Sequence, residues 1–175
     1  ITAENVKDEL NSALVYHVMN MLQEEFLYWY RRGVQPILTR TKDIREDILN
    51  IVQENHAEEF VAFKNGFFLQ KPVTYTARRK GVQSKIKKLN EYLYRSGKSE
   101  ADNKTADWFH TVGKGVTYIE PSDDPDVPFT AYALDPRSAF VVYSLKPGNK
   151  PIMGVNFVTT EDGRAMFDVF TERMV

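Results

Sequence analysis

The three histidines are the residues whose type best suits metal binding or proton transfer. His17, His56 and His110 lie far apart in the chain, so no pair of them has ligand spacing. In the stretch NHAEEF, Glu59 or Glu58 lies about one helical turn after His56, which would place two possible ligands on one helix face. A zinc site needs three or four ligands. We therefore interpret this stretch as an exposed polar helix face.

Other patterns that could carry chemistry are also incomplete. The Gly-Lys-Gly cluster at residues 113–115 lacks the strand-loop-helix order of a phosphate-binding loop, and its glycines more simply provide a helix stop and a tight bend. The carboxylate pairs Glu24-Glu25 and Asp123-Asp124 are neighbours in sequence only, and no serine stands in a nucleophile elbow. The absence of cysteine excludes a disulfide framework and a thiolate metal site. We predict no catalytic residue, no cofactor and no metal site.

The basic segment, TARRKGVQSKIKKLNEYLYRSGK at residues 76–98, is the strongest remaining candidate for a functional surface. It has eight basic residues and one acidic residue, Glu91, although the whole chain carries a net charge of -1. Lysines on the wet side of an amphipathic helix usually serve solubility, whereas such an excess also suits salt-sensitive, sequence-blind phosphate contact. No interleaved aromatic platform for stacking bases accompanies it. The candidates for subunit-interface or phosphate contact are Arg78, Arg79, Lys80, Lys85, Lys87 and Lys88.

The composition is that of one soluble, folded domain. Of the 175 residues, 42% are hydrophobic and 13% are aromatic, which favours a packed core over disorder. No apolar run approaches the roughly 20 residues of a membrane span, and the N-terminus is too polar for a signal peptide. Because residue 1 is not methionine, we expect a trimmed or partial chain.

Two helices are predicted in the N-terminal third. Residues 5–32 should form a long helix that stops at Gly33, with its apolar face towards the core. That face comprises Leu10, Leu14, Met19 or Val18, Leu22, Phe26, and Trp29 or Tyr30. A second helix should begin near Thr41, whose side chain would cap its first turn. Its inner face should comprise Ile44, Ile48, Ile51 or Val52, and Asn55, and should continue toward Phe60 and Phe63.

Two further helices are predicted before residue 115. The basic segment should be an amphipathic helix that ends at Gly97, because its apolar residues recur at steps of four, three and four. This stripe comprises Val82, Ile86, Leu89 and Leu93. The next helix should run from about Ser99 to the glycines at 113–115. Its inward residues should be Ala101, Thr105, Trp108 or Phe109, and Val112.

The chain after Gly115 is predicted to form about five antiparallel strands. Short runs rich in β-branched and aromatic residues (VTYIE, PFTAYAL, AFVVYSL, IMGVNFVTT and RAMFDVFTE) alternate with turn sequences. Asp162-Gly163 is the strongest hairpin signal. We therefore predict an α+β fold, in which about four N-terminal helices precede an antiparallel β meander.

Five stretches of the sequence resemble one known family when they are taken in order. They are WYRRGVQPI (29–37), FFLQKPVTY (67–75), ADNKTADWFHTVGKGVTYIE (101–120), ALDPRSAFVVYS (133–144) and FDVFTE (167–172). Their order and spacing resemble the N-terminal, or wing, part of tailed-bacteriophage portal proteins, which are head-tail connectors. On this resemblance we expect residues 1–114 to be the helical part of the wing and 115–175 its antiparallel β part.

The resemblance implies a structural role without catalysis or cofactor. Portal subunits form a ring, typically a dodecamer, at one vertex of the capsid, and genomic double-stranded DNA is packaged and ejected through it. The implied partners are other copies of the chain, the major capsid protein, the terminase large subunit, the head-tail adaptor and the DNA. The implied location is the virion, after synthesis in the bacterial host cytoplasm, with no membrane involved.

Two roles for the basic segment remain open on these grounds. In a ring, it would face an acidic surface of the next subunit, such as residues 43–60, because complementary charge can set the register of a repeated contact. The alternative is a monomeric, sequence-nonspecific nucleic-acid-binding domain that uses a basic helix at residues 76–98. For the chain as a whole, a third interpretation is a different phage head or connector protein with a similar α+β module.

Overall fold

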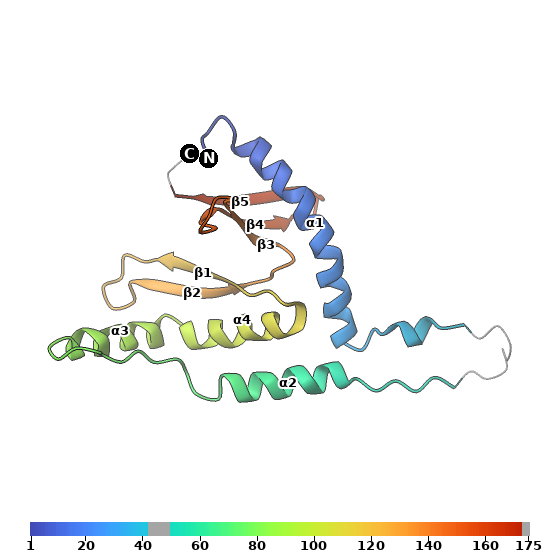
Figure 1. Cartoon of the computed structure of the whole chain (residues 1–175), viewed down its shortest axis with the longest axis horizontal. Coiled ribbons are helices and arrows are strands. Elements are labelled where there is room, and N and C mark those ends of the chain that lie inside the picture. Colours follow the sequence, from blue (N-terminus) through green and yellow to red (C-terminus); the bar gives the residue numbers. More distant parts are fainter. Residues whose placement is uncertain (42–49, 173–175) are drawn as a thin grey trace.

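A computed structural model describes residues 1–41 and 50–172 of the chain (Figure 1). The helices are α1 (Val6–Arg31), the short 3-10 helix η1 (Pro36–Thr39), α2 (His56–Phe68), α3 (Gln83–Arg95) and α4 (Lys98–Val112). The strands are β1 (Val116–Pro121), β2 (Phe129–Leu134), β3 (Ala139–Tyr143), β4 (Pro151–Thr159) and β5 (Ala165–Thr171). All strand pairs in these residues are antiparallel, so the predicted α+β class is confirmed.

Helix α1 has the predicted extent but not the predicted orientation. Its C-terminal end is fixed at Gly33, which has a φ of +89°, and by a hydrogen bond from the Val34 N–H to the Trp29 carbonyl. The expectation that Leu22 and Phe26 face the core was wrong, because both are exposed. The buried residues of α1 are instead His17 and Glu24.

The second predicted helix begins later than expected. Residues 50–55 are not helical, and α2 starts only at His56, while residues 42–49, which include Ile44 and Ile48, lie outside the described part of the chain. The physical reason is Asn55, whose side chain accepts a hydrogen bond from the Glu58 N–H and caps α2. The predicted inward face of α2 was also wrong, since Phe60 and Phe63 are exposed.

The basic segment is helical over only part of its length. Helix α3 begins at Gln83 rather than at residue 76, because Gly81 turns the chain with a φ of +92° and donates its N–H to the Gln83 side chain. The predicted stripe is confirmed at Ile86, Leu89 and Leu93, which are half-buried.

Helix α4 matches its prediction more closely. Ala101 and Val112 are buried as expected, and the helix ends at Gly113, which has a φ of +81°. Helix α4 contacts β2, α2 and α1, and Figure 1 shows it between the β1–β2 pair and α2. It is therefore the central element of the helical part.

The predicted meander is divided into two sheets. Strands β1 and β2 form one pair, and β3, β4 and β5 form a separate three-stranded sheet in that order. The division falls at residues 135–138, where the Ser138 N–H donates to the Asp135 carbonyl in a turn. The hairpin predicted at Asp162-Gly163 is confirmed, since the strands on either side of it pair in register from Thr159 and Ala165.

The described residues bury few large apolar side chains. The buried apolar residues are Val61, Ala101, Ala106, Val112, Ala131, Ala139, Met153 and Val155. Many large apolar side chains are exposed instead. Exposed apolar patches of this kind are typical of surfaces that contact a partner. None of the described helices has both the length and the apolar character that a bilayer crossing requires.

Candidate functional site

The six predicted contact residues lie at one end of the molecule. Arg78, Arg79 and Lys80 belong to the turn before α3, and Lys85, Lys87 and Lys88 are on α3 itself; all six are exposed. Figure 1 places α3 at one end of the long axis, beyond the end of α4. The structure thus gathers these cations at one tip of the chain.

The charge at this tip is largely uncompensated. Among the described residues, Arg78, Arg79, Lys80, Lys85 and Lys87 form no ion pair. Lys88 has its ammonium 5.2 Å from the centre of the Tyr92 ring, and the hydrogen bond to Tyr92 raises the pKa of Lys88. Arg95 is the exception, since it pairs with Glu91 at 2.8 Å. A surface of this kind has the charge to attract an acidic partner from outside the chain.

The acidic residues at the opposite end are partly neutralised within the chain. The His56 ring nitrogens lie 2.9 Å from Glu54 and 3.0 Å from Glu59. Hydrogen bonds with Glu59 and then Glu54 raise the pKa of His56 above its ordinary value. Glu58 pairs with Arg31 at 2.7 Å. Among the described residues, no group of three or more histidine or carboxylate side chains could hold a metal ion.

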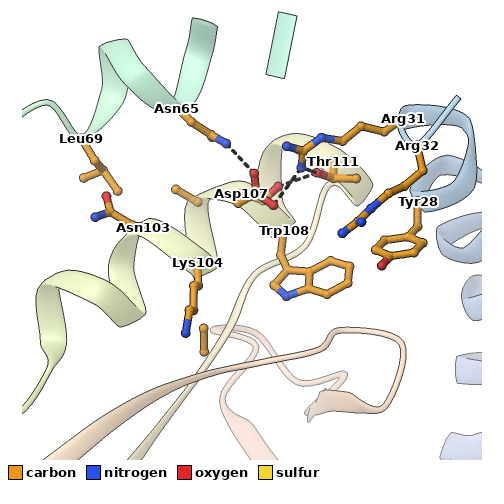
Figure 2. A pocket seen from close by; sticks show the side chains of 12 residues that line it. Tyr28, Arg31, Arg32, Asn65, Leu69, Asn103, Lys104, Asp107, Trp108 and Thr111 are labelled. Carbon is orange, nitrogen blue, oxygen red and sulfur yellow. Dashed lines mark hydrogen bonds and ion pairs between the residues drawn. The ribbon is translucent and has the colours of Figure 1, made fainter. Parts of the chain in front are cut away.

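A second set of charged residues joins α1, α2 and α4 (Figure 2). Arg31, in the last turn of α1, donates to Asp107 at 2.8 Å and to Thr111 at 2.6 Å, both on α4, and to Glu58 at the start of α2. Burial alone lowers the pKa of Arg31, but the hydrogen bonds to Asp107 and Glu58 outweigh it and raise that pKa. Asn65 of α2 donates to the second Asp107 oxygen at 2.6 Å. The Asp107 carboxylate therefore ties both α1 and α2 to α4.

Arg137, in the turn between the two sheets, is held by charge and by aromatic rings. Its guanidinium donates to Asp135 at 3.0 and 2.6 Å and to Glu25 of α1 at 2.8 Å. It lies 4.1 Å from the Tyr28 ring centre and 5.3 Å from that of Trp108, within cation–π range. The hydrogen bonds with Asp135 raise the pKa of Arg137 despite its partial burial. We call the contacts of Arg31 and Arg137 the arginine junction.

The arginine junction borders a hollow of about 430 Å³ (Figure 2). Figure 2 shows Arg31, Asp107 and Thr111 meeting at one side of it, with Tyr28 and Trp108 below and Lys104 apart from them. Each charged group at this meeting point already has a partner of opposite charge. Such an arrangement fixes the relative positions of the helices.

The Gly-Lys-Gly turn is explained by packing. Lys114 donates to the buried Glu24 carboxylate of α1. A Cβ on Gly115 would lie 2.6 Å from Thr105 Cγ2 and 2.8 Å from the Thr105 carbonyl oxygen, so glycine is required where β1 leaves α4. The neighbours Glu24 and Glu25 bind different partners, since Glu25 reaches Arg137. These residues hold α1 in place.

Comparison with known protein families shows which family the chain belongs to. The family described as phage portal protein, SPP1 Gp6-like, matches residues 18–175. The chain belongs to this family. A search of curated proteins gives no significant match. Portal proteins are structural head-tail connectors of the phage capsid and belong to the DNA-packaging apparatus.

The arginine junction of this portal protein was missed in the sequence, although three of the family stretches contain part of it. Arg31 lies in WYRRGVQPI, Asp107 and Trp108 lie in ADNKTADWFHTVGKGVTYIE, and Asp135 and Arg137 lie in ALDPRSAFVVYS. Three of the stretches that carry the resemblance therefore meet in space. The one signal available was that each contains a charged residue beside an aromatic residue or in a turn.

Proposed function

We propose that this chain is a portal subunit that assembles with further copies into a ring at one capsid vertex. The observation that carries the proposal is the family match over residues 18–175. The arginine junction supports it, because three helices and the turn between the sheets are tied into one unit that could transmit load. Through the ring, double-stranded DNA would enter during packaging and leave during ejection.

The partners of this ring are part of the same proposal. They are the major capsid protein, the terminase large subunit and the head-tail adaptor, together with the DNA. We propose that residues 1–114 and 115–175 are the helical and β parts of one wing region in the virion, and that the subunit itself performs no catalysis.

Negative-stain electron microscopy of the full-length gene product tests the proposal directly. We expect rotationally symmetric rings of about a dozen subunits with a central hole. Monodisperse single subunits over the whole accessible concentration range would contradict it.

For the basic segment we propose an interface role. Its uncompensated cations lie at the opposite end of the long axis from residues 50–59, which is the arrangement that a head-to-tail contact between copies needs (Figure 1). The variant with Lys85, Lys87 and Lys88 changed to Glu should fail to form rings at physiological salt. If its rings form normally and only DNA retention is impaired, the interface role is wrong.

A nucleic-acid-binding monomer is the second candidate. It is favoured by the five cations of the basic segment that have no ion-pair partner among the described residues, which are Arg78, Arg79, Lys80, Lys85 and Lys87. If each cation neutralises one phosphate, log Kd should change with log salt by a slope of roughly one per contact. A salt titration of the wild-type chain with double-stranded DNA separates the candidates, because a ring subunit whose basic segment is occupied by a neighbour should show a much smaller slope.

A further inference from the structure

The outer face of α1 is an uninterrupted apolar stripe. Its members are Val15, Val18, Met19, Leu22, Phe26 and Trp29, and their exposed fractions run from 46% at Val18 and Trp29 to 69% at Met19. With 3.6 residues per turn, these six positions fall within roughly one third of the helix circumference over about 20 Å. No charged residue falls within that arc between Val15 and Trp29. We call this surface the α1 face.

The α1 face cannot turn inward, because the opposite side of the helix is anchored. The His17 and Phe140 rings stack with their centres 4.3 Å apart, and the His17 Nε2–H donates to the Arg137 carbonyl oxygen at 2.9 Å. Tyr28 stacks on Trp108 at 5.5 Å. A surface helix normally turns its polar side to water, so the reversed arrangement indicates that a further partner covers the apolar side.

Helix α2 presents a second apolar surface of the same kind. Phe60, Phe63 and Phe67 lie on one side of the helix, and they are 68%, 73% and 82% exposed. The Phe63 and Phe67 rings stack with centres 6.5 Å apart. The other side of α2 is occupied, since Val61 is buried and Asn65 binds Asp107. We call the three rings the α2 face.

The two faces together offer enough surface for one specific contact. A fully buried aromatic side chain contributes about 150–250 Å², so the exposed parts of these nine side chains amount to on the order of 1,000 Å², near the lower bound of a specific interface. Figure 1 shows α1 and α2 running in different directions along different sides of the molecule. A symmetric dimer through the α1 face would leave the α2 face uncovered, whereas a head-to-tail contact covers both.

We propose that the α1 face of one copy packs against the α2 face of the next copy. This inference rests on the proposed ring, and it names the apolar contact within that ring. The contact has two different halves, so it repeats from copy to copy until the ring closes. Leu22, at the centre of the α1 face, should then lie close to Phe63 of the neighbouring copy.

Single-cysteine cross-linking tests the contact, because residues 1–175 contain no cysteine and any cysteine elsewhere in the full-length gene product is first replaced by serine. The full-length gene product is prepared as Leu22→Cys and as Phe63→Cys, and the two are mixed, assembled and oxidised. A disulfide requires Cα atoms within about 7 Å. We therefore expect a covalent dimer in the mixture and little in either variant alone. A chain that carries both substitutions should give a ladder of oligomers.

Gln23 provides the matched control, since it is exposed on α1 next to Leu22 but outside the α1 face. Gln23→Cys mixed with Phe63→Cys should give several-fold less dimer. In parallel, Leu22→Glu should abolish rings, and Gln23→Glu should leave them intact. Circular dichroism shows whether each variant keeps its fold.

Three outcomes would overturn the inference. Rings in which cysteines at positions 22 and 63 both react fully with a maleimide would show that the ring stands without this contact. Efficient dimers from Leu22→Cys alone would show a symmetric α1 contact. Protection of that thiol in full-length monomers would show that the chain covers its own α1 face. Absence of rings from the wild type contradicts the proposed function itself, and electron microscopy reports that separately.

Discussion

The arginine junction and the basic segment are both rich in cations, but only the cations of the junction have carboxylate partners throughout. Arg31 and Arg137 each have carboxylate partners within 3 Å, and Arg137 also lies against two aromatic rings. Lys85 and Lys87, in contrast, have no ion-pair partner within the described chain. Charge density alone therefore does not identify an interface; what distinguishes the two regions is whether the chain supplies the counter-charge.

The largest effect should come from removing the best-partnered cation. Arg137→Ala removes the guanidinium that donates to Asp135 and Glu25 and that lies against the Tyr28 and Trp108 rings. We expect a loss of about 2–3 kcal/mol in the free energy of unfolding, measured by urea denaturation. Arg137→Lys, which keeps the charge but not the planar fork, should lose less than Arg137→Ala. If the Arg137→Ala variant were as stable as the wild type, the arginine junction would contribute no more to stability than the basic segment does.

Asp107 should give the next largest effect. Asp107→Ala removes the acceptor shared by Arg31 and Asn65, and Asp107 is partly exposed, so we expect a loss of about 1–2 kcal/mol. Urea denaturation measures it, and Glu100→Ala, which breaks an exposed pair on the same helix, is the matched control and should lose much less. Equal losses at the two positions would show that Asp107 is an ordinary surface carboxylate.

The basic segment should contribute little to stability. Among the described residues, Lys85, Lys87 and Lys88 have no carboxylate partner, so their joint replacement by Gln should leave the free energy of unfolding almost unchanged. Differential scanning fluorimetry at low and high salt checks this. A clear destabilisation would mean that the segment is a structural element like the junction.

The smallest effect concerns the exposed acidic end. The pKa of His56 is raised by Glu59 and Glu54, so its stabilising contribution is fully present below pH 6.5 and is lost as the pH rises through the raised pKa. NMR titration should show the His56 pKa fall towards 6.5 in Glu59→Gln. An unchanged pKa in that variant would show that the His56–Glu59 contact is absent in solution.

Features that depend on a few adjacent residues were predicted better than features that depend on contacts with distant parts of the chain. Gly113 ends α4, and Asp162-Gly163 forms a hairpin, because each feature depends on a few adjacent residues. The start of α2 was misplaced because apolar spacing suggested a helix from Thr41, while the cap that begins it is Asn55. That cap also donates to the Arg31 carbonyl, a contact 24 residues away that spacing cannot reveal.

The sequence by itself determined the class of fold, the order of the helices and strands, the cationic character of residues 76–98 and the resemblance to portal proteins. The tertiary structure alone decided which side of α1 faces inward. Periodicity defines an apolar stripe but not the neighbour that it meets, and here the neighbours of α1 are Phe140, Trp108 and Arg137, which favour the side carrying His17, Tyr28 and Glu25. The apolar stripe is left for a partner because burial depends on what packs against a helix and not on the helix alone.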